Sequence, residues 1–105
     1  MAVNKYHAQK TEVDGMVFDS KREASRYREL VLLQRAGVIQ GLRRQVPFTL
    51  IPKSPIGRAI VYKADFVYMQ DGKEIVEDVK GVQTPVYRLK KRLLAERYGI
   101  RIQEV

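Results

Sequence analysis

The chain of 105 residues contains no cysteine, so disulfide bonds and thiolate metal sites are excluded. It also has no apolar run of about eighteen residues and no signal-peptide pattern at its N-terminus. We therefore expect a soluble protein with no membrane partner and a cytoplasmic location. The single histidine, His7, lies in a polar N-terminal stretch, where solvation is a simpler role than metal binding or base catalysis.

Acidic residues are in the minority. The 12 aspartate and glutamate residues are outnumbered by 20 lysine and arginine residues, which gives a formal net charge of +8. For one small domain this is a strong positive field, and nucleic acid is the usual partner of such a field. Solubility alone is the alternative. We expect a basic N-terminal arm over residues 1–10 and a single domain over residues 11–105.

Two helices are predicted from the residues at their ends. Ser20 and Glu23 form the S-x-x-E capping box of a helix that should end near Ala36, before Gly37. Capping is one role for Glu23, but this residue also begins the stripe that should face the sheet, which is unusual for a carboxylate without a partner. A second helix should run over residues 84–98. Its expected inward side chains are Val86, Leu89, Leu93 and Leu94, with Lys90 among them.

Shorter elements should complete the domain. Pro47 indicates a strand at a sheet edge, because proline cannot donate a hydrogen bond to a ladder. The remaining elements expected are a hairpin over residues 11–18, a basic connection over 41–44, a strand over 45–51, a loop over 52–59 and a closing strand from residue 100.

The strongest strand signal is a hairpin over residues 62–80. Two runs of strand-type residues flank Asp71-Gly72, a dipeptide that favours a two-residue type I′ turn. So tight a turn pairs Gln70 with Lys73 and sets the register of the whole hairpin. On the first strand, one face should then carry the core residues Ile60, Tyr62, Ala64, Phe66 and Tyr68.

The same register places Asp65 opposite Asp78 and Lys63 opposite Lys80. Alternation points these four side chains to one face and Glu77 to the other. Two carboxylates that face each other across a ladder repel, and a divalent cation would offset that repulsion. Carboxylate oxygens suit Mg²⁺ or Mn²⁺. A solvated hairpin with scattered charges is the alternative interpretation.

The element order and the acidic residues together resemble the PD-(D/E)XK nuclease superfamily. Asp65 matches the first motif aspartate, and D-V-K at residues 78–80 matches the (D/E)-x-K triplet on the next strand. The stretch F-D-S-K-R-E, residues 18–23, is similar to the F-x-S-x-x-E opening of resolvase-like branches, in which Glu23 takes the place of the helix-one glutamate. The resemblance covers roughly residues 5–105 and is to small phage-encoded members.

This resemblance implies an α/β fold like that of restriction endonucleases, with a mixed central sheet flanked by two helices in the order αβββαβ. It implies Mg²⁺ or Mn²⁺ as cofactor, held by Asp65, Asp78, the Val79 carbonyl and Glu23. Lys80 would orient or help deprotonate the attacking water, and the implied catalytic residues are Glu23, Asp65, Asp78 and Lys80. The basic side chains expected to contact DNA are Arg22, Arg26, Lys63, Arg88, Lys90 and Lys91; for Lys90, covering apolar surface is the alternative.

The leading functional hypothesis is a metal-dependent endonuclease that cleaves branched or otherwise structured DNA in phage recombination or replication, within the host cytoplasm. A homodimer would place two sites on two strands. A non-catalytic DNA-binding module on the same fold is the alternative from a different class. A third hypothesis, an RNA-binding protein, is weakened because Tyr62, Phe66 and Tyr68 are expected in the core and not on an open stacking face.

Overall fold

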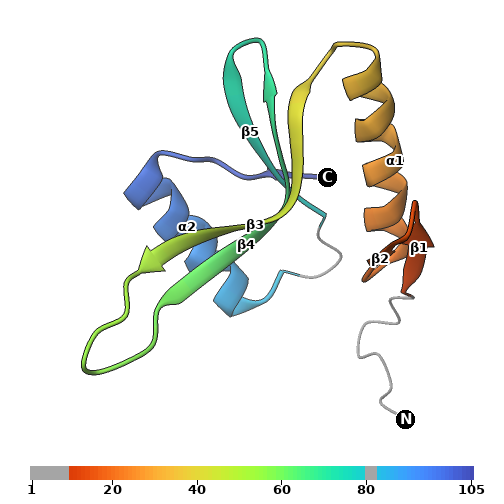
Figure 1. Ribbon diagram of the computed structural model, residues 1–105. Coiled ribbons are helices and arrows are strands. Elements are labelled where there is room, and N and C mark those ends of the chain that lie inside the picture. The colour runs from red at the N-terminus through yellow and green to blue at the C-terminus, as the bar shows by residue number, and fades with distance from the viewer. Residues whose placement is uncertain (1–9, 80–82) are drawn as a thin grey trace.

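The protein is an α/β domain in which one helix packs on each face of a mixed four-stranded sheet (Figure 1). The structure is a computed structural model, and it describes residues 10–79 and 83–105. The expected order of helix, three strands, helix and strand is confirmed, as is the short leading hairpin. The elements are β1 (Thr11–Val13), β2 (Met16–Phe18), α1 (Lys21–Arg35), β3 (Gln40–Ile51), β4 (Ile60–Gln70), β5 (Lys73–Asp78), α2 (Pro85–Tyr98) and β6 (Gln103–Glu104).

The hairpin of β4 and β5 has the predicted register. Gln70 pairs with Lys73, and the ladder continues in step to the pair Phe66 and Glu77. Asp71 and Gly72 have φ angles of 52° and 75°, so both central residues of the turn are left-handed, as a type I′ turn requires. The turn chemistry therefore fixes which residues of β4 and β5 meet at the far end of the hairpin.

Strand β3 begins earlier than predicted. It starts at Gln40, so the interpretation of residues 41–44 as a connection is wrong, and Arg43 and Arg44 pair with β4. The error has a physical cause: β3 lies at the edge of the order β3-β4-β5-β6, where charged side chains can face solvent. The edge position itself agrees with the prediction from Pro47.

The expected single core face of β4 is also wrong. Tyr62 and Ala64 belong to the apolar cluster that contains the α2 residues, whereas Phe66 and Tyr68 belong to the cluster that contains the α1 residues. The change of side occurs between the β3 pairing partners of Ala64 and Phe66, where Gln45 has a φ of 54°. The change of side in β4 thus lies beside the left-handed Gln45 of β3, and strict alternation along β4 does not predict it. Ile60, expected in the core, is 39% exposed.

Both helices begin and end close to the predicted residues. Ser20 caps α1 and Thr84 caps α2, while the left-handed Gly99 terminates α2. The inward face of α2 differs, however, because Val86 and Leu89 are 62% and 59% exposed. The spacing of the apolar residues alone did not identify the buried side of α2, because Tyr87 and not Val86 faces the core. The buried residues of α2 are Tyr87 and Leu94.

The chain closes with β6, which pairs parallel to β5. Ile102, directly before it, is buried beneath α2. This places the C-terminal segment beside the strand that carries the candidate site. No helix in the described ranges is long and apolar enough to cross a membrane.

Candidate active site

Polar side chains from three elements meet where β3 and β4 bend. The Gln45 amide on β3 donates hydrogen bonds to Glu23 Oε1 of α1 at 3.1 Å and to Asp65 Oδ1 of β4 at 3.5 Å. One carboxamide therefore bridges the two carboxylates. Glu23 and Asp65, 42 residues apart in the sequence, converge as predicted.

Asp65 and Asp78 form a pair at the end of the hairpin. The Val79 backbone N–H donates to Asp65 Oδ2 at 2.8 Å, and the Tyr62 hydroxyl donates to Asp78 Oδ2. Asp78 is only 1% exposed. The Val79 backbone thus holds Asp65, and Tyr62 holds Asp78, where the two carboxyl groups lie next to each other.

The surroundings of this pair change the pKa values of Asp65 and Tyr62. Burial, followed by the hydrogen bond and the charge of Asp78, raises the pKa of Asp65 to about 8, and the Val79 N–H opposes this shift. Burial and the Asp78 hydrogen bond also raise the pKa of the Tyr62 hydroxyl. A carboxylate that is costly to ionise in place favours a proton or a cation beside it.

The backbone and the side chain of Glu23 make separate contacts. Its backbone N–H donates to the Ser20 hydroxyl at 3.1 Å, which caps α1. Its side chain is buried and faces Gln45, away from the capping interaction. Burial, followed by the charge of Asp19, raises its pKa, and Asp78 contributes to the same shift. The capping function therefore leaves the carboxylate available to the site.

The carboxylate oxygens of Glu23, Asp65 and Asp78 are of the kind that a hard divalent cation prefers. Within residues 10–79 and 83–105, however, no three histidine, cysteine, aspartate or glutamate side chains lie close enough to hold one ion. Asp65 and Asp78 form a pair, and Gln45 is bound between Asp65 and Glu23. Val79 directly follows β5, whereas Lys80 lies outside the described residues, as does His7.

Directly beside Asp78, Glu77 forms a second acidic centre on the opposite face of β5. Arg26 of α1 binds it with both arms of its guanidinium group, with Nε 2.8 Å from Oε1 and Nη2 2.6 Å from Oε2. The Tyr68 hydroxyl also donates to Glu77, and Arg26 reaches Glu29 at 2.9 Å. The hydrogen bond to Glu77 is the main cause that raises the pKa of Arg26. Arg26, predicted to contact DNA, thus holds a buried carboxylate.

Sequence reasoning missed Gln45 and this ion pair. Gln45 carries no titratable group, and its strand was expected to alternate regularly. A signal for the ion pair did exist, because Arg26 lies three residues after Glu23 on the same side of α1. A glutamate on the buried face of β5 also needs a cation.

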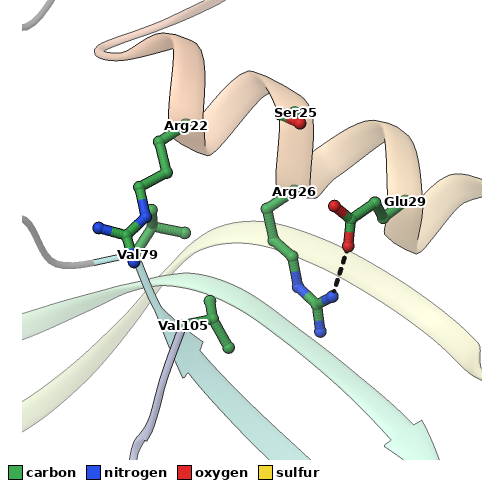
Figure 2. A pocket seen from close by; sticks show the side chains of 6 residues that line it. All are labelled: Arg22, Ser25, Arg26, Glu29, Val79 and Val105. Carbon is green, nitrogen blue, oxygen red and sulfur yellow. Dashed lines mark hydrogen bonds and ion pairs between the residues drawn. The ribbon is translucent and has the colours of Figure 1, made fainter.

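The remaining basic candidates lie in separate hollows. Figure 2 shows Arg22 reaching from α1 toward Val79, in a hollow of about 280 Å³ that Arg26 and Val105 also line. Lys63 and Lys90 line another hollow of about 330 Å³, together with Tyr62, the residue that donates to Asp78. Of the other candidates, Arg88 is exposed and Lys91 forms an ion pair with Glu104 at 2.9 Å.

Comparison with curated proteins and with solved structures finds no match. A family model described as "Protein of unknown function (DUF1064)" matches residues 3–103, which is nearly the whole chain. That match includes every residue of the acidic site and both helices. The chain therefore belongs to the DUF1064 family of proteins of unknown function.

Proposed function

We propose that this protein is a metal-dependent endonuclease that hydrolyses phosphodiester bonds in DNA, on a fold of the restriction-endonuclease type. The observation that carries the proposal is the pair of the half-buried Asp65 and the buried Asp78, with Glu23 held one amide away. Perturbed carboxylates that gather at one point are typical of catalytic and metal-binding sites. The net charge of +8 supports a polyanionic substrate.

Asp65 and Asp78 would hold Mg²⁺ or Mn²⁺ between them, with the Val79 carbonyl and Glu23 as further oxygen donors. When bound, such an ion would supply Lewis-acid stabilisation of the phosphate and a more acidic water. The protein's own groups orient the donors: Gln45 fixes Glu23, the Val79 N–H fixes Asp65, and Tyr62 fixes Asp78. Lys80, two residues after Asp78, is proposed to orient the attacking water and to balance negative charge.

A non-catalytic DNA-binding module is the second candidate. The observation that favours it is that the described carboxylates provide a close pair and not a group of three. Such a module would bind DNA through its positive charge, with a steep dependence on salt, and would cleave nothing.

Cleavage assays separate the two candidates. The wild type, Asp78→Asn and Asp71→Asn are incubated with linear, nicked, flap and four-way-junction DNA, with and without Mg²⁺ or Mn²⁺. Asp78→Asn keeps an acceptor for the Tyr62 hydroxyl and removes one ligand charge. Asp71→Asn is the matched control, because asparagine suits the same left-handed turn position at the exposed end of the hairpin.

We expect metal-dependent cleavage by the wild type and by Asp71→Asn, and a loss of at least about 100-fold in Asp78→Asn, in line with the effect of removing one charge-stabilising group. An absence of cleavage of every DNA form with both metals would overturn the proposal. The panel also tests the rest of the proposal, namely a preference for branched DNA in phage recombination or replication. Two-fold dimers in the host cytoplasm would present two such sites to two strands.

A further inference from the structure

A positively charged hollow lies away from the acidic site, between α2 and the segment before β6. Its volume is about 390 Å³. Of the seven residues that line it, four are cationic and three are apolar. They are Arg88, Lys91, Arg92, Ala95, Ile100, Arg101 and Ile102.

A polar network anchored on Glu104 builds this hollow. Lys91 binds Glu104 Oε1 at 2.9 Å, and Oε2 accepts from the Tyr87 hydroxyl at 2.9 Å and from the Gln83 amide at 2.8 Å. The Lys91 hydrogen bond is the largest of the causes that lower the pKa of Glu104. Three groups from α2 and its N-terminal approach thus fix the C-terminal segment against α2. Arg101 is held beside the α2 arginines as a result.

The charge in the hollow is unbalanced. Glu104 neutralises Lys91, but none of the ion pairs found within the described ranges involves Arg88, Arg92 or Arg101. Like charges gathered around a partly apolar floor repel one another, and the repulsion is relieved when an anion enters. Planar guanidinium groups match phosphate oxygens in geometry and are more weakly hydrated than ammonium groups.

The hollow is also distinct from the one next to the catalytic candidates. Lys63 and Lys90 line a hollow that includes Tyr62 and the opposite side of α2, and the two hollows share no lining residue. A nucleic-acid strand in the hollow of Lys63 and Lys90 would lie beside Tyr62, the residue that contacts Asp78. A strand in the hollow of Arg88 and Arg101 would not lie beside that residue.

We propose that the hollow of Arg88, Arg92 and Arg101 binds the phosphate backbone of duplex DNA without any metal, as a contact separate from the strand presented to Asp65 and Asp78. This inference deepens the proposed function and rests on it for the strand at the acidic site, whereas binding of a duplex by the hollow does not depend on cleavage. The contact would hold a second stretch of DNA while the first is at the acidic site, which favours substrates with more than one duplex arm.

The test measures binding of a short fluorescent DNA duplex by anisotropy in EDTA at several salt concentrations. The hollow variant is Arg88→Gln/Arg92→Gln/Arg101→Gln. The matched control, Arg28→Gln/Arg35→Gln/Lys53→Gln, removes the same charge from exposed residues elsewhere. We expect the hollow variant to lower the slope of log K against log salt by about 2.7, since each phosphate contact contributes about 0.9. The control should change it by less than about 1.

A charge-preserving variant, Arg88→Lys/Arg92→Lys/Arg101→Lys, should retain most of the wild-type slope, and circular dichroism checks that each variant is folded. If the triple glutamine variant does not fold, Arg92→Gln alone should lower the slope by about 0.9. The inference would be overturned if the glutamine variants of the hollow kept the wild-type salt slope, or if the control variant lost as much of the slope as they do. Because EDTA removes the metal, this outcome is independent of whether the protein cleaves DNA.

Discussion

Glu77 and Asp78 are neighbours on β5, yet the protein treats their charges in opposite ways. Glu77 is fully buried and is bound by the guanidinium group of Arg26 and by the Tyr68 hydroxyl. Asp78, on the other face, is nearly as buried but lies next to a second carboxyl group, that of Asp65. The first centre pairs opposite charges, and the second brings like charges together.

The difference separates a structural centre from a functional one. A buried ion pair that is fully hydrogen-bonded ties α1 to β5 and needs no further ligand. A buried pair of carboxyl groups raises the pKa of Asp65 and costs stability unless a proton or a cation joins it. Natural proteins retain such costs where function requires them. On the proposed function, Asp65 and Asp78, and not Glu77, form the centre that would take a cation.

The pH dependence of stability provides the largest test of this comparison. Asp65 has a pKa of about 8 in the fold against 3.8 as its ordinary value. Between these values the folded protein holds a proton that the unfolded chain has released, so the stabilising contribution of Asp65 is greatest below about pH 4 and is lost as the pH rises toward 8. We expect a loss on the order of 5 kcal/mol from this group across that window, in metal-free buffer.

Urea unfolding at several pH values measures this loss. Asp65→Asn should flatten the profile and be more stable than the wild type at pH 8, whereas Asp71→Asn, at the exposed turn, should follow the wild-type profile. A wild-type profile that is flat or rises between pH 5 and 8 would contradict the arrangement of the acidic pair.

The second test breaks the ion pair of Glu77. Arg26→Met keeps the apolar stem of the side chain but leaves a fully buried carboxylate without its cation. Removal of one partner from a buried pair typically destabilises a protein by about 3–5 kcal/mol. Urea unfolding should show this loss, and Arg28→Met, on the exposed side of the same helix, should change stability by less than about 0.5 kcal/mol.

The double variant Arg26→Met/Glu77→Gln should recover part of the lost stability. Equal stability of Arg26→Met and the wild type would show that Glu77 does not need Arg26 as its partner.

The sequence predicted those features of the fold that depend on a few neighbouring residues, such as turns and helix ends. The Asp71-Gly72 turn fixed the register of β4 and β5, and Ser20, Thr84 and Gly99 fixed helix ends. What failed depended on tertiary packing. The faces of β4 required knowledge of the left-handed Gln45 on another strand.

The site was predictable in part for the same reason. The position of Asp65 near Asp78 followed from the turn, and the approach of Glu23 followed from the family resemblance. The contact between Arg26 and Glu77 joins residues 51 positions apart, so the local signal in each segment indicates the need for a partner without identifying it. Charge alone therefore did not reveal the ion pair of Arg26, because an arginine that neutralises a buried acid looks the same in sequence as one that faces a phosphate.

The smallest effect that we predict is stabilisation by a divalent cation. If Mg²⁺ joins the Asp65 and Asp78 pair, a concentration ten times its dissociation constant should add about 1.4 kcal/mol at pH 8. That corresponds to a rise in melting temperature of about 5 °C or more for a domain of this size. At pH 5 the same concentration should stabilise less, because the ion must displace the proton that burial and Asp78 retain on Asp65. Thermal unfolding with and without Mg²⁺ measures the shift.

Asp65→Asn should abolish this shift in melting temperature. Glu74→Gln should keep it, because Glu74 is an exposed residue of β5 that is paired only weakly to Arg43 at 3.5 Å. A shift that survives in Asp65→Asn would place the ion elsewhere and remove the distinction between the two faces of β5.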